Sequence, residues 1–184
     1  MKPVLVLALG SPVFGDDDVG AHVLAALADD PEVAAVAELG RGGTDLFRLA
    51  DRIPGRGRLV LVDAALGTGA ARVVVRRHPP NAPGERRTHA HDLDPVAALE
   101  LLRRHDPAIA AVPAWWLLLD VPELALRAGL SATARTLVKD AAVQLRALVL
   151  EPACPELPPK RSAAAGLESG DPVQRPSRCG PSLQ

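Results

Sequence analysis

Residues 4–20, VLVLALGSPVFGDDDVG, join a run of six apolar residues directly to a glycine-containing acidic segment. A continuous apolar run of this length is typical of a strand buried on both faces of a parallel sheet. Val19, Val23 and Leu27 then recur at helical spacing, and Asp18 is placed to cap that helix. The stretch therefore predicts a β-strand followed by an α-helix, the unit from which α/β folds are built.

The same alternation continues along the chain. Further strands are predicted at residues 33–39, 59–62, 72–78 and 114–121. Helices are predicted at residues 44–53, after a cap at Asp92 or Asp94, and after a cap at Ser131. The charges of segment 72–78 favour an edge position for that strand. The pattern predicts an α/β fold, a three-layer α/β/α sandwich around a mostly parallel sheet.

Composition divides the 184 residues into a domain at residues 1–150 and a tail at residues 151–184. The tail holds seven of the 18 prolines and little apolar periodicity, so we expect it to be disordered. Both cysteines, Cys154 and Cys179, lie in the tail, so neither a disulfide framework nor a thiolate metal site is indicated in the domain. The residue types therefore favour a cytoplasmic protein with one globular domain.

The balance of charged residues, the low aromatic content and the short apolar runs exclude several classes of partner. Lys plus Arg number 21 against 22 Asp plus Glu, and aromatic residues make up 2% of the chain. This composition offers neither a basic footprint for nucleic acid nor a stacking platform for bases. The longest apolar runs fall short of a membrane span, and the acidic segment after residue 12 does not fit a signal peptide. We expect no nucleic-acid or membrane partner, and the sequence does not indicate an oligomeric state.

Polar residues follow the predicted strands at the edge where α/β sheets bind ligands. Asp16, Asp17 and Asp18 follow the first strand, Asp63 follows strand 59–62, and a long loop at residues 79–90 leads to the segment Thr88-His89-Ala90-His91. Carboxylates together with imidazole suit nickel or zinc. The alternatives remain open: the aspartates can cap a helix, Asp63 can begin a turn, and the histidines can belong to a solvated loop.

Five motifs in order resemble the family of hydrogenase maturation endopeptidases. The first strand and its acidic segment are similar to the family's Gly-Asn-x-Leu-x-x-Asp-Asp/Glu-Gly-x-Gly opening. Four later segments match the family's order: Gly40-Arg41-Gly42-Gly43 with Asp45-Leu46, the strand that ends in Asp63-Ala64, Thr88-His89-Ala90-His91, and Asp120-Val121-Pro122-Glu123 with Gly129-Leu130-Ser131. The resemblance covers residues 4–149 and implies a phosphorylase/hydrolase-like sandwich.

The resemblance implies an activity and a set of site residues. Members of the family remove a C-terminal peptide from the large-subunit precursor of nickel-iron hydrogenase after the metal is inserted. By motif position, Asp17, Asp63 and His91 would bind nickel carried by the precursor and would form the catalytic site. The metal would polarise the scissile carbonyl or activate a water. His89 competes with His91 for the role of ligand, and the three consecutive aspartates leave the first ligand ambiguous by one residue.

Three positions depart from the family's pattern. Ser11-Pro12 replaces the usual Asn, Asp18 stands where Gly is common, and Arg41 replaces a Thr of the second motif. The charge of Arg41 could alter which precursor is accepted. Two other functions are compatible with parts of the sequence: a non-catalytic chaperone that recognises nickel, and a plain nucleotide-binding domain. The missing phosphate-binding fingerprint argues against the second.

Overall fold

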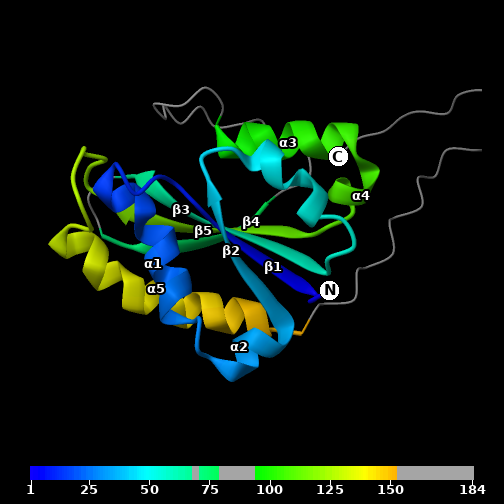
Figure 1. Ribbon diagram of the computed structural model, residues 1–184, viewed down its shortest axis with the longest axis horizontal. Coiled ribbons are helices and arrows are strands. Elements are labelled where there is room, and N and C mark those ends of the chain that lie inside the picture. The colour runs from blue at the N-terminus through cyan, green and yellow to red at the C-terminus, as the bar shows by residue number, and fades with distance from the viewer. Residues whose placement is uncertain (68–70, 79–93, 153–184) are drawn as a thin grey trace, which may run out of the picture. The chain divides into compact units, whose positions relative to one another are not determined.

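A five-stranded sheet in the order β2-β1-β3-β5-β4 forms the centre of the computed structural model, which describes residues 1–67, 71–78 and 94–152 (Figure 1). Its strands are β1 (Val4–Leu9), β2 (Ala37–Gly43), β3 (Arg58–Leu66), β4 (Val73–Arg77) and β5 (Ala114–Val121). The helical elements are η1 (Gly15–Asp18), α1 (Val19–Ala26), α2 (Pro31–Val36), η2 (Leu46–Arg52), α3 (Pro95–His105), α4 (Pro107–Ala110) and α5 (Ala132–Leu150).

Four of these strands run parallel, and β4 pairs antiparallel with β5 at the edge of the sheet. The predicted edge position of segment 72–78 is therefore confirmed, since Arg76 and Arg77 are exposed there. Strand β1 lies between β2 and β3, and all six of its residues are buried. This burial on both faces explains why its sequence is continuously apolar rather than alternating.

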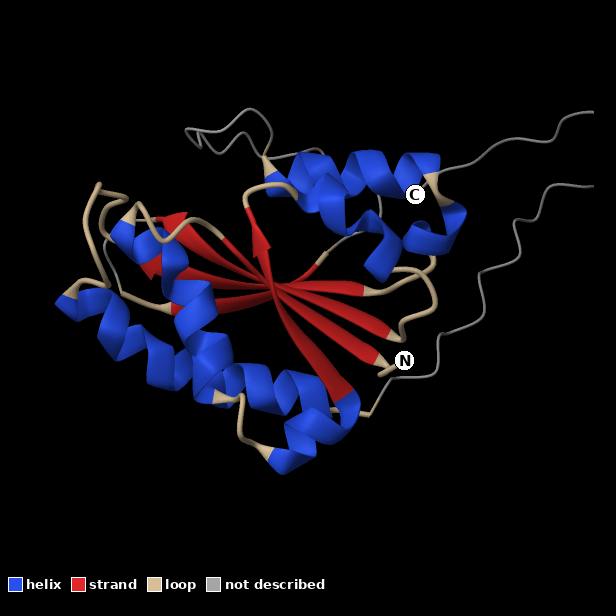
Figure 2. Cartoon of the chain, viewed as in Figure 1, coloured by secondary structure: helices blue, strands red, loops and turns tan. Residues whose placement is uncertain are grey.

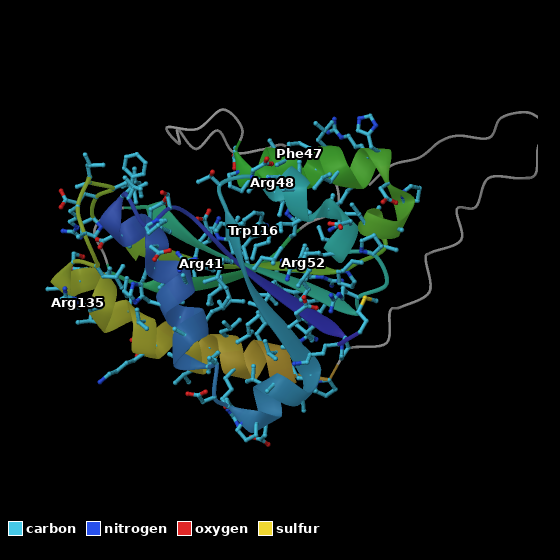
Figure 3. The ribbon with its side chains drawn as sticks, in the orientation of Figure 1. Arg41, Phe47, Arg48, Arg52, Trp116 and Arg135 are labelled. Carbon is cyan, nitrogen blue, oxygen red and sulfur yellow. The ribbon has the colours of Figure 1, made fainter. Side chains whose placement is uncertain are left out.

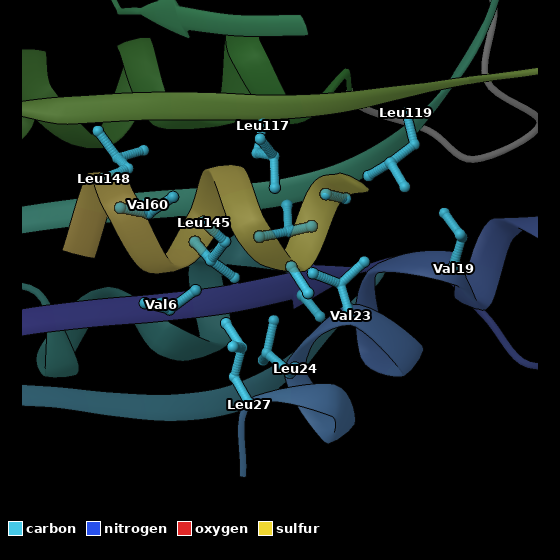
Figure 4. Packing of buried hydrophobic residues seen from close by; sticks show 14 of the residues in the cluster. Val6, Val19, Val23, Leu24, Leu27, Val60, Leu117, Leu119, Leu145 and Leu148 are labelled. Carbon is cyan, nitrogen blue, oxygen red and sulfur yellow. The ribbon is translucent and has the colours of Figure 1, made fainter. Parts of the chain in front are cut away.

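Helices cover both faces of the sheet, which confirms the predicted three-layer sandwich (Figures 1 and 2). Alternate residues of β1 point to opposite layers. Val6 and Ala8 pack in the cluster that includes α1 and α5, whereas Leu5 and Leu7 pack in the cluster that includes α3. Figure 4 shows the first cluster, in which Val23 of α1 and Leu145 of α5 meet the sheet.

The second strand begins later than its sequence indicates. Residues 33–36 belong to α2, and β2 starts only at Ala37. The Asp30 side chain accepts hydrogen bonds from the backbone N–H groups of Glu32 and Val33 at 2.9 and 3.2 Å, and Pro31 occupies the first helical turn. These local start signals outweigh the β-branched residues that made the segment look extended.

The expected helix at 44–53 is a 3-10 helix, η2, capped by Asp45 through a 3.0 Å bond from the Phe47 N–H. Glycines of β2 let this element pack closely on the strand. A Cβ at Gly40 would lie 2.8 Å from the Arg52 guanidinium, and a Cβ at Gly42 would lie 2.7 Å from the Leu9 side chain. Gly40 therefore allows close packing of η2 on β2, and Gly42 allows close packing of β2 on Leu9 of β1.

The last helices largely follow their predicted starts. Asp94 caps α3 and Ser131 caps α5 through side-chain bonds of 2.9 and 3.0 Å, and the short helix α4 was not predicted. One compact unit spans Met1–Ala153. The predicted loop at 79–90, Asp92, and the tail from residue 153 with both cysteines lie outside the described residues. No helix in the described ranges is long and apolar enough to cross a membrane.

Candidate functional site

Asp16, the first of the three consecutive aspartates, is a structural residue with no exposed surface. Its carboxylate accepts hydrogen bonds from the Ser131 N–H and hydroxyl, both at 2.6 Å, and from the Arg127 guanidinium at 2.5 Å. Burial by itself would raise the pKa of Asp16, but the hydrogen bonds from Ser131 and Arg127 outweigh it and lower the pKa below its usual value. These bonds join η1 to the start of α5.

Asp17, the second aspartate, is held at the carboxyl end of β1. Its Oδ2 accepts the Ser11 N–H at 2.7 Å, and this bond engages only one of the two carboxylate oxygens. Gly10 makes the arrangement possible, since it has a φ of +108° and a Cβ there would lie 1.9 Å from the Asp17 carbonyl oxygen. The backbone of the first motif therefore orients Asp17 while leaving its side chain partly exposed.

Asp18, the third aspartate, does not cap α1 with its side chain, so that expectation was wrong. Its carboxylate pairs with the guanidinium of Arg41, which reaches from β2 to the start of α1 (Figure 3). His22, one turn along α1, lies 4.0 Å from the same carboxylate. Because Arg41 engages Asp18, the three aspartates have three different environments, and the departures at positions 18 and 41 form one ion pair.

Asp63 lies within a strand rather than at its end. Strand β3 continues to Leu66, so the expectation that the strand ends at Asp63 was wrong. The side chain has 7% exposure and belongs to the face that carries Leu61 and Ala65. The start of α1 packs close by, since a Cβ at Gly20 would lie 2.9 Å from the carbonyl oxygen of Val62.

The described residues supply only part of the predicted ligand set. Asp17 and Asp63 belong to neighbouring parts of the site, because η1 contacts both β1 and β3. His89 and His91 lie outside the described residues. Among residues 1–67, 71–78 and 94–152, no group of three His, Cys, Asp or Glu side chains could hold a metal ion. Two carboxylates and an imidazole suit a divalent transition metal, so the chemistry of the described pair is compatible with nickel.

Sequence reasoning missed the partly buried partners of Asp16. The sequence indicates Ser131 as a helix cap and as part of the last motif but not as a partner of Asp16, and it does not single out Arg127. The parallel bridge between Phe14 and Arg127, together with the 3.2 Å bond from the Arg127 N–H to the Val13 carbonyl, joins the loop after β1 to the loop after β5. No local pattern indicates this pairing, because the two loops are more than a hundred residues apart in sequence.

A further carboxylate, Asp120, is buried near the carboxyl end of β5. It has 6% exposure, its Oδ1 has no hydrogen-bond partner in the described part of the chain, and the Arg72 guanidinium lies 3.9 Å from its Oδ2. A Cβ at Gly67 would lie 2.0 Å from this Oδ1, so only glycine fits against the carboxylate. The motif around Asp120 therefore holds the end of β3 against β5.

Solved structures of hydrogenase maturation proteases share this fold. A [NiFe] hydrogenase maturation protease, HybD from Thermococcus kodakarensis, is 27% identical with a TM-score of 0.62, and the match covers 81% of this chain and 99% of that one. The chain is similar in fold and in sequence to the hydrogenase maturation proteases. This similarity supports a peptidase role.

More distant structures show the same fold. The hydrogenase maturating endopeptidase HybD from E. coli is 19% identical, with a TM-score of 0.60 over 80% of this chain and 91% of that one. The maturation protease HycI from Thermococcus kodakarensis is 17% identical, with a TM-score of 0.64 over 81% of this chain and 92% of that one. Neither a model of a protein family nor a curated protein sequence matches the chain.

Proposed function

We propose that this maturation protease removes a C-terminal peptide from a nickel-iron hydrogenase large-subunit precursor after nickel has been inserted. The observation that carries the proposal is the placement of Asp17. It is the one aspartate of the three that neither a buried network nor an arginine engages, since Asp16 binds Ser131 and Arg127 and Asp18 binds Arg41. Its position matches the acidic ligand of the family's first motif.

Asp17 and Asp63 would contact the nickel that the precursor carries, with His91 as the third contact. Nickel held there would polarise the scissile carbonyl or activate a water. The Ser11 N–H holds Asp17 in one orientation, so the carboxylate meets the cation without first losing side-chain freedom. Asp63 is buried in β3, where a carboxylate is stabilised by a nearby cation.

The roles of the other polar residues follow from their bonds. Asp16 is buried and fixes η1 through its hydrogen bonds to Ser131, and it takes no part in metal recognition. Arg41 offsets the charge of Asp18, which would otherwise compete with Asp17 for the cation. The cysteines lie outside residues 1–150, so the domain does not depend on an oxidising compartment, and we propose a cytoplasmic location.

A cleavage assay tests the proposal. The protein is mixed with nickel-loaded and with nickel-free large-subunit precursor, and the released C-terminal peptide is followed by mass spectrometry. We expect release only from the loaded form, and we expect Asp17→Asn, Asp63→Asn and His91→Gln each to abolish it. Asp140→Asn, on the exposed surface of α5, is the matched control that keeps full activity.

Three results would contradict parts of the proposal. Binding of loaded precursor without release of a peptide would assign the protein to the non-catalytic nickel-recognising chaperones. Cleavage that survives both Asp17→Asn and His91→Gln would show that the ligand set is wrong. Release from nickel-free precursor at the same rate would remove nickel from the mechanism.

A further inference from the structure

Several exposed apolar side chains follow the carboxyl ends of the parallel strands. Within the described residues, eight large apolar side chains are exposed, and four of them lie at or beyond the carboxyl ends of the four parallel strands. They are Val13 after β1, Phe47 after β2, Leu66 at the end of β3 and Leu126 after β5. This is the end of the sheet that carries Asp17, and Phe47 is labelled in Figure 3.

Val13 and Leu126 are held in place by the buried network beneath them. Val13 is 54% exposed and Leu126 is 75% exposed. The residue after Leu126, Arg127, donates its N–H to the Val13 carbonyl at 3.2 Å and its guanidinium to buried Asp16 at 2.5 Å. The backbone that carries these two exposed apolar side chains is therefore fixed by an ion pair to a buried carboxylate, although exposed loop tips are ordinarily mobile and polar.

The pair lies next to the candidate site. The Val13 N–H donates to the Ser11 hydroxyl at 3.3 Å, and the Ser11 N–H donates to Asp17 at 2.7 Å. Val13 is two residues from Ser11, and two residues span at most about 7 Å. Any macromolecule that brings a cation to Asp17 therefore comes within reach of Val13. Its apolar side chains would bury Val13 and Leu126, while its cation would complement the carboxylates.

We propose that Val13 and Leu126 form an apolar docking surface for the segment of the large-subunit precursor that flanks the nickel and the scissile bond. The inference rests on the proposed function and adds a binding surface to it. The surface would take apolar side chains of the precursor, while Asp17 takes the cation. Affinity for the precursor then comes from the apolar contacts and from the contact between Asp17 and the cation. Only the contact with Asp17 depends on nickel.

A binding assay separates the two sources. Fluorescently labelled large-subunit precursor, nickel-loaded or nickel-free, is titrated with wild-type protein and with Val13→Ser, Leu126→Ser and the double variant. We expect each single variant to raise the dissociation constant about tenfold for both forms of precursor, which is the value of burying part of one aliphatic side chain. Val143→Ser removes a side chain of α5 that is 70% exposed and is the matched control, with an unchanged dissociation constant.

The readout does not require cleavage, so the two proposals can fail separately. Wild-type protein that binds precursor through Val13 and Leu126 but releases no peptide would overturn the proposed function and keep the surface. Variants that bind precursor as tightly as wild type, in a protein that does cleave it, would overturn the surface. Sedimentation serves as a second measurement: self-association that is lost in Val13→Ser, with precursor binding unchanged, would reassign the surface to a second copy of this chain.

Discussion

Ser131 donates both its N–H and its hydroxyl to the carboxylate of Asp16, each at 2.6 Å, across 115 residues of sequence. The same hydroxyl oxygen accepts the Ala134 N–H at 3.0 Å, so one side chain caps α5 and satisfies a buried acid. The start of α5 and the loop that carries Asp17 are thereby joined. The geometry of the candidate site therefore depends on a residue that would not contact the substrate.

Asp16→Asn should destabilise the fold. The amide keeps the volume but replaces one acceptor oxygen with a donor, which faces Arg127 and Ser131 inside the protein. We expect a loss of about 3 kcal/mol in the free energy of unfolding, since charge-assisted hydrogen bonds to a fully buried carboxylate are lost. Urea unfolding measures this loss. Asp45→Asn is the control, because asparagine caps η2 as well as aspartate does; equal stability of Asp16→Asn and the control would contradict the role of Asp16.

The free energy of unfolding should also depend on pH, because two carboxyl groups have lowered pKa values in the folded protein. The pKa of Asp16 is lowered by Ser131 and Arg127 against the effect of burial, and the pKa of Glu38 is lowered by hydrogen bonds from Arg52 and Arg56. A pKa below its unfolded value contributes stability that is complete above the unfolded pKa, here above about pH 5 for both groups, and is lost as the pH falls through the folded pKa. Thermal unfolding between pH 7 and pH 3 should show this loss. Asp16→Asn should flatten the profile, and an identical slope in that variant would argue against the assignment.

The three consecutive aspartates should differ in activity when each is replaced by asparagine. Asp17→Asn should lower peptide release on the order of a thousandfold, because a metal contact supplies several kcal/mol to the transition state. Asp18→Asn should cost about tenfold or less, since that carboxylate pairs with Arg41 beside the site. Cleavage rates at saturating nickel-loaded precursor measure the difference. A larger loss of cleavage rate for Asp18→Asn than for Asp17→Asn would assign the role of metal ligand to Asp18 instead of Asp17.

Gly10→Ala should displace Asp17, whereas Gly43→Ala should not. Both glycines have positive φ, +108° and +63°, so both variants carry the backbone cost of about 1–2 kcal/mol. Only at Gly10 does the added Cβ meet another atom, the Asp17 carbonyl oxygen at 1.9 Å, while at Gly43 nothing lies within 4 Å. Gly10→Ala should therefore lose more stability and nearly all cleavage. Equal unfolding midpoints and activities for the two variants would contradict the close packing at Gly10.

A buried network under α3 should fix the tautomer of His78. Trp116 donates its Nε1–H to His78 Nδ1 at 3.0 Å, and the His78 Nε2 contacts the Glu100 carboxylate. Because indole nitrogen only donates, Nδ1 is unprotonated and Nε2 carries the proton toward Glu100. Nitrogen NMR should show a pyridine-like Nδ1 in the native protein. Glu100→Gln should cost about 2 kcal/mol in urea unfolding, and a protonated Nδ1 at pH 7 would refute the network.

Local sequence was sufficient for most of the fold. The strands at 4–9 and 114–121, the edge position of β4 and the caps of α3 and α5 were all predicted from apolar runs and side-chain caps. It failed at residues 33–36, where Asp30 and Pro31 start a helix that the sequence analysis did not predict, and at Asp63, where the strand continues past the charge. A charged residue inside a strand looks like a strand end until the partner strands are known.

The sequence by itself determined that carboxylates would gather at the carboxyl edge of a parallel sheet, because strand order and alternation are encoded in local apolar patterns. Only the tertiary structure decided which carboxylate of residues 16–18 has which environment. The physical reason is that the environment of a carboxylate is set by the groups that donate hydrogen bonds to it. Ser131 and Arg127 donate to Asp16, Arg41 donates to Asp18, and Ser11 donates to Asp17. Apart from Ser11, those donors are distant in sequence, so no local pattern could distinguish three identical residues in a row.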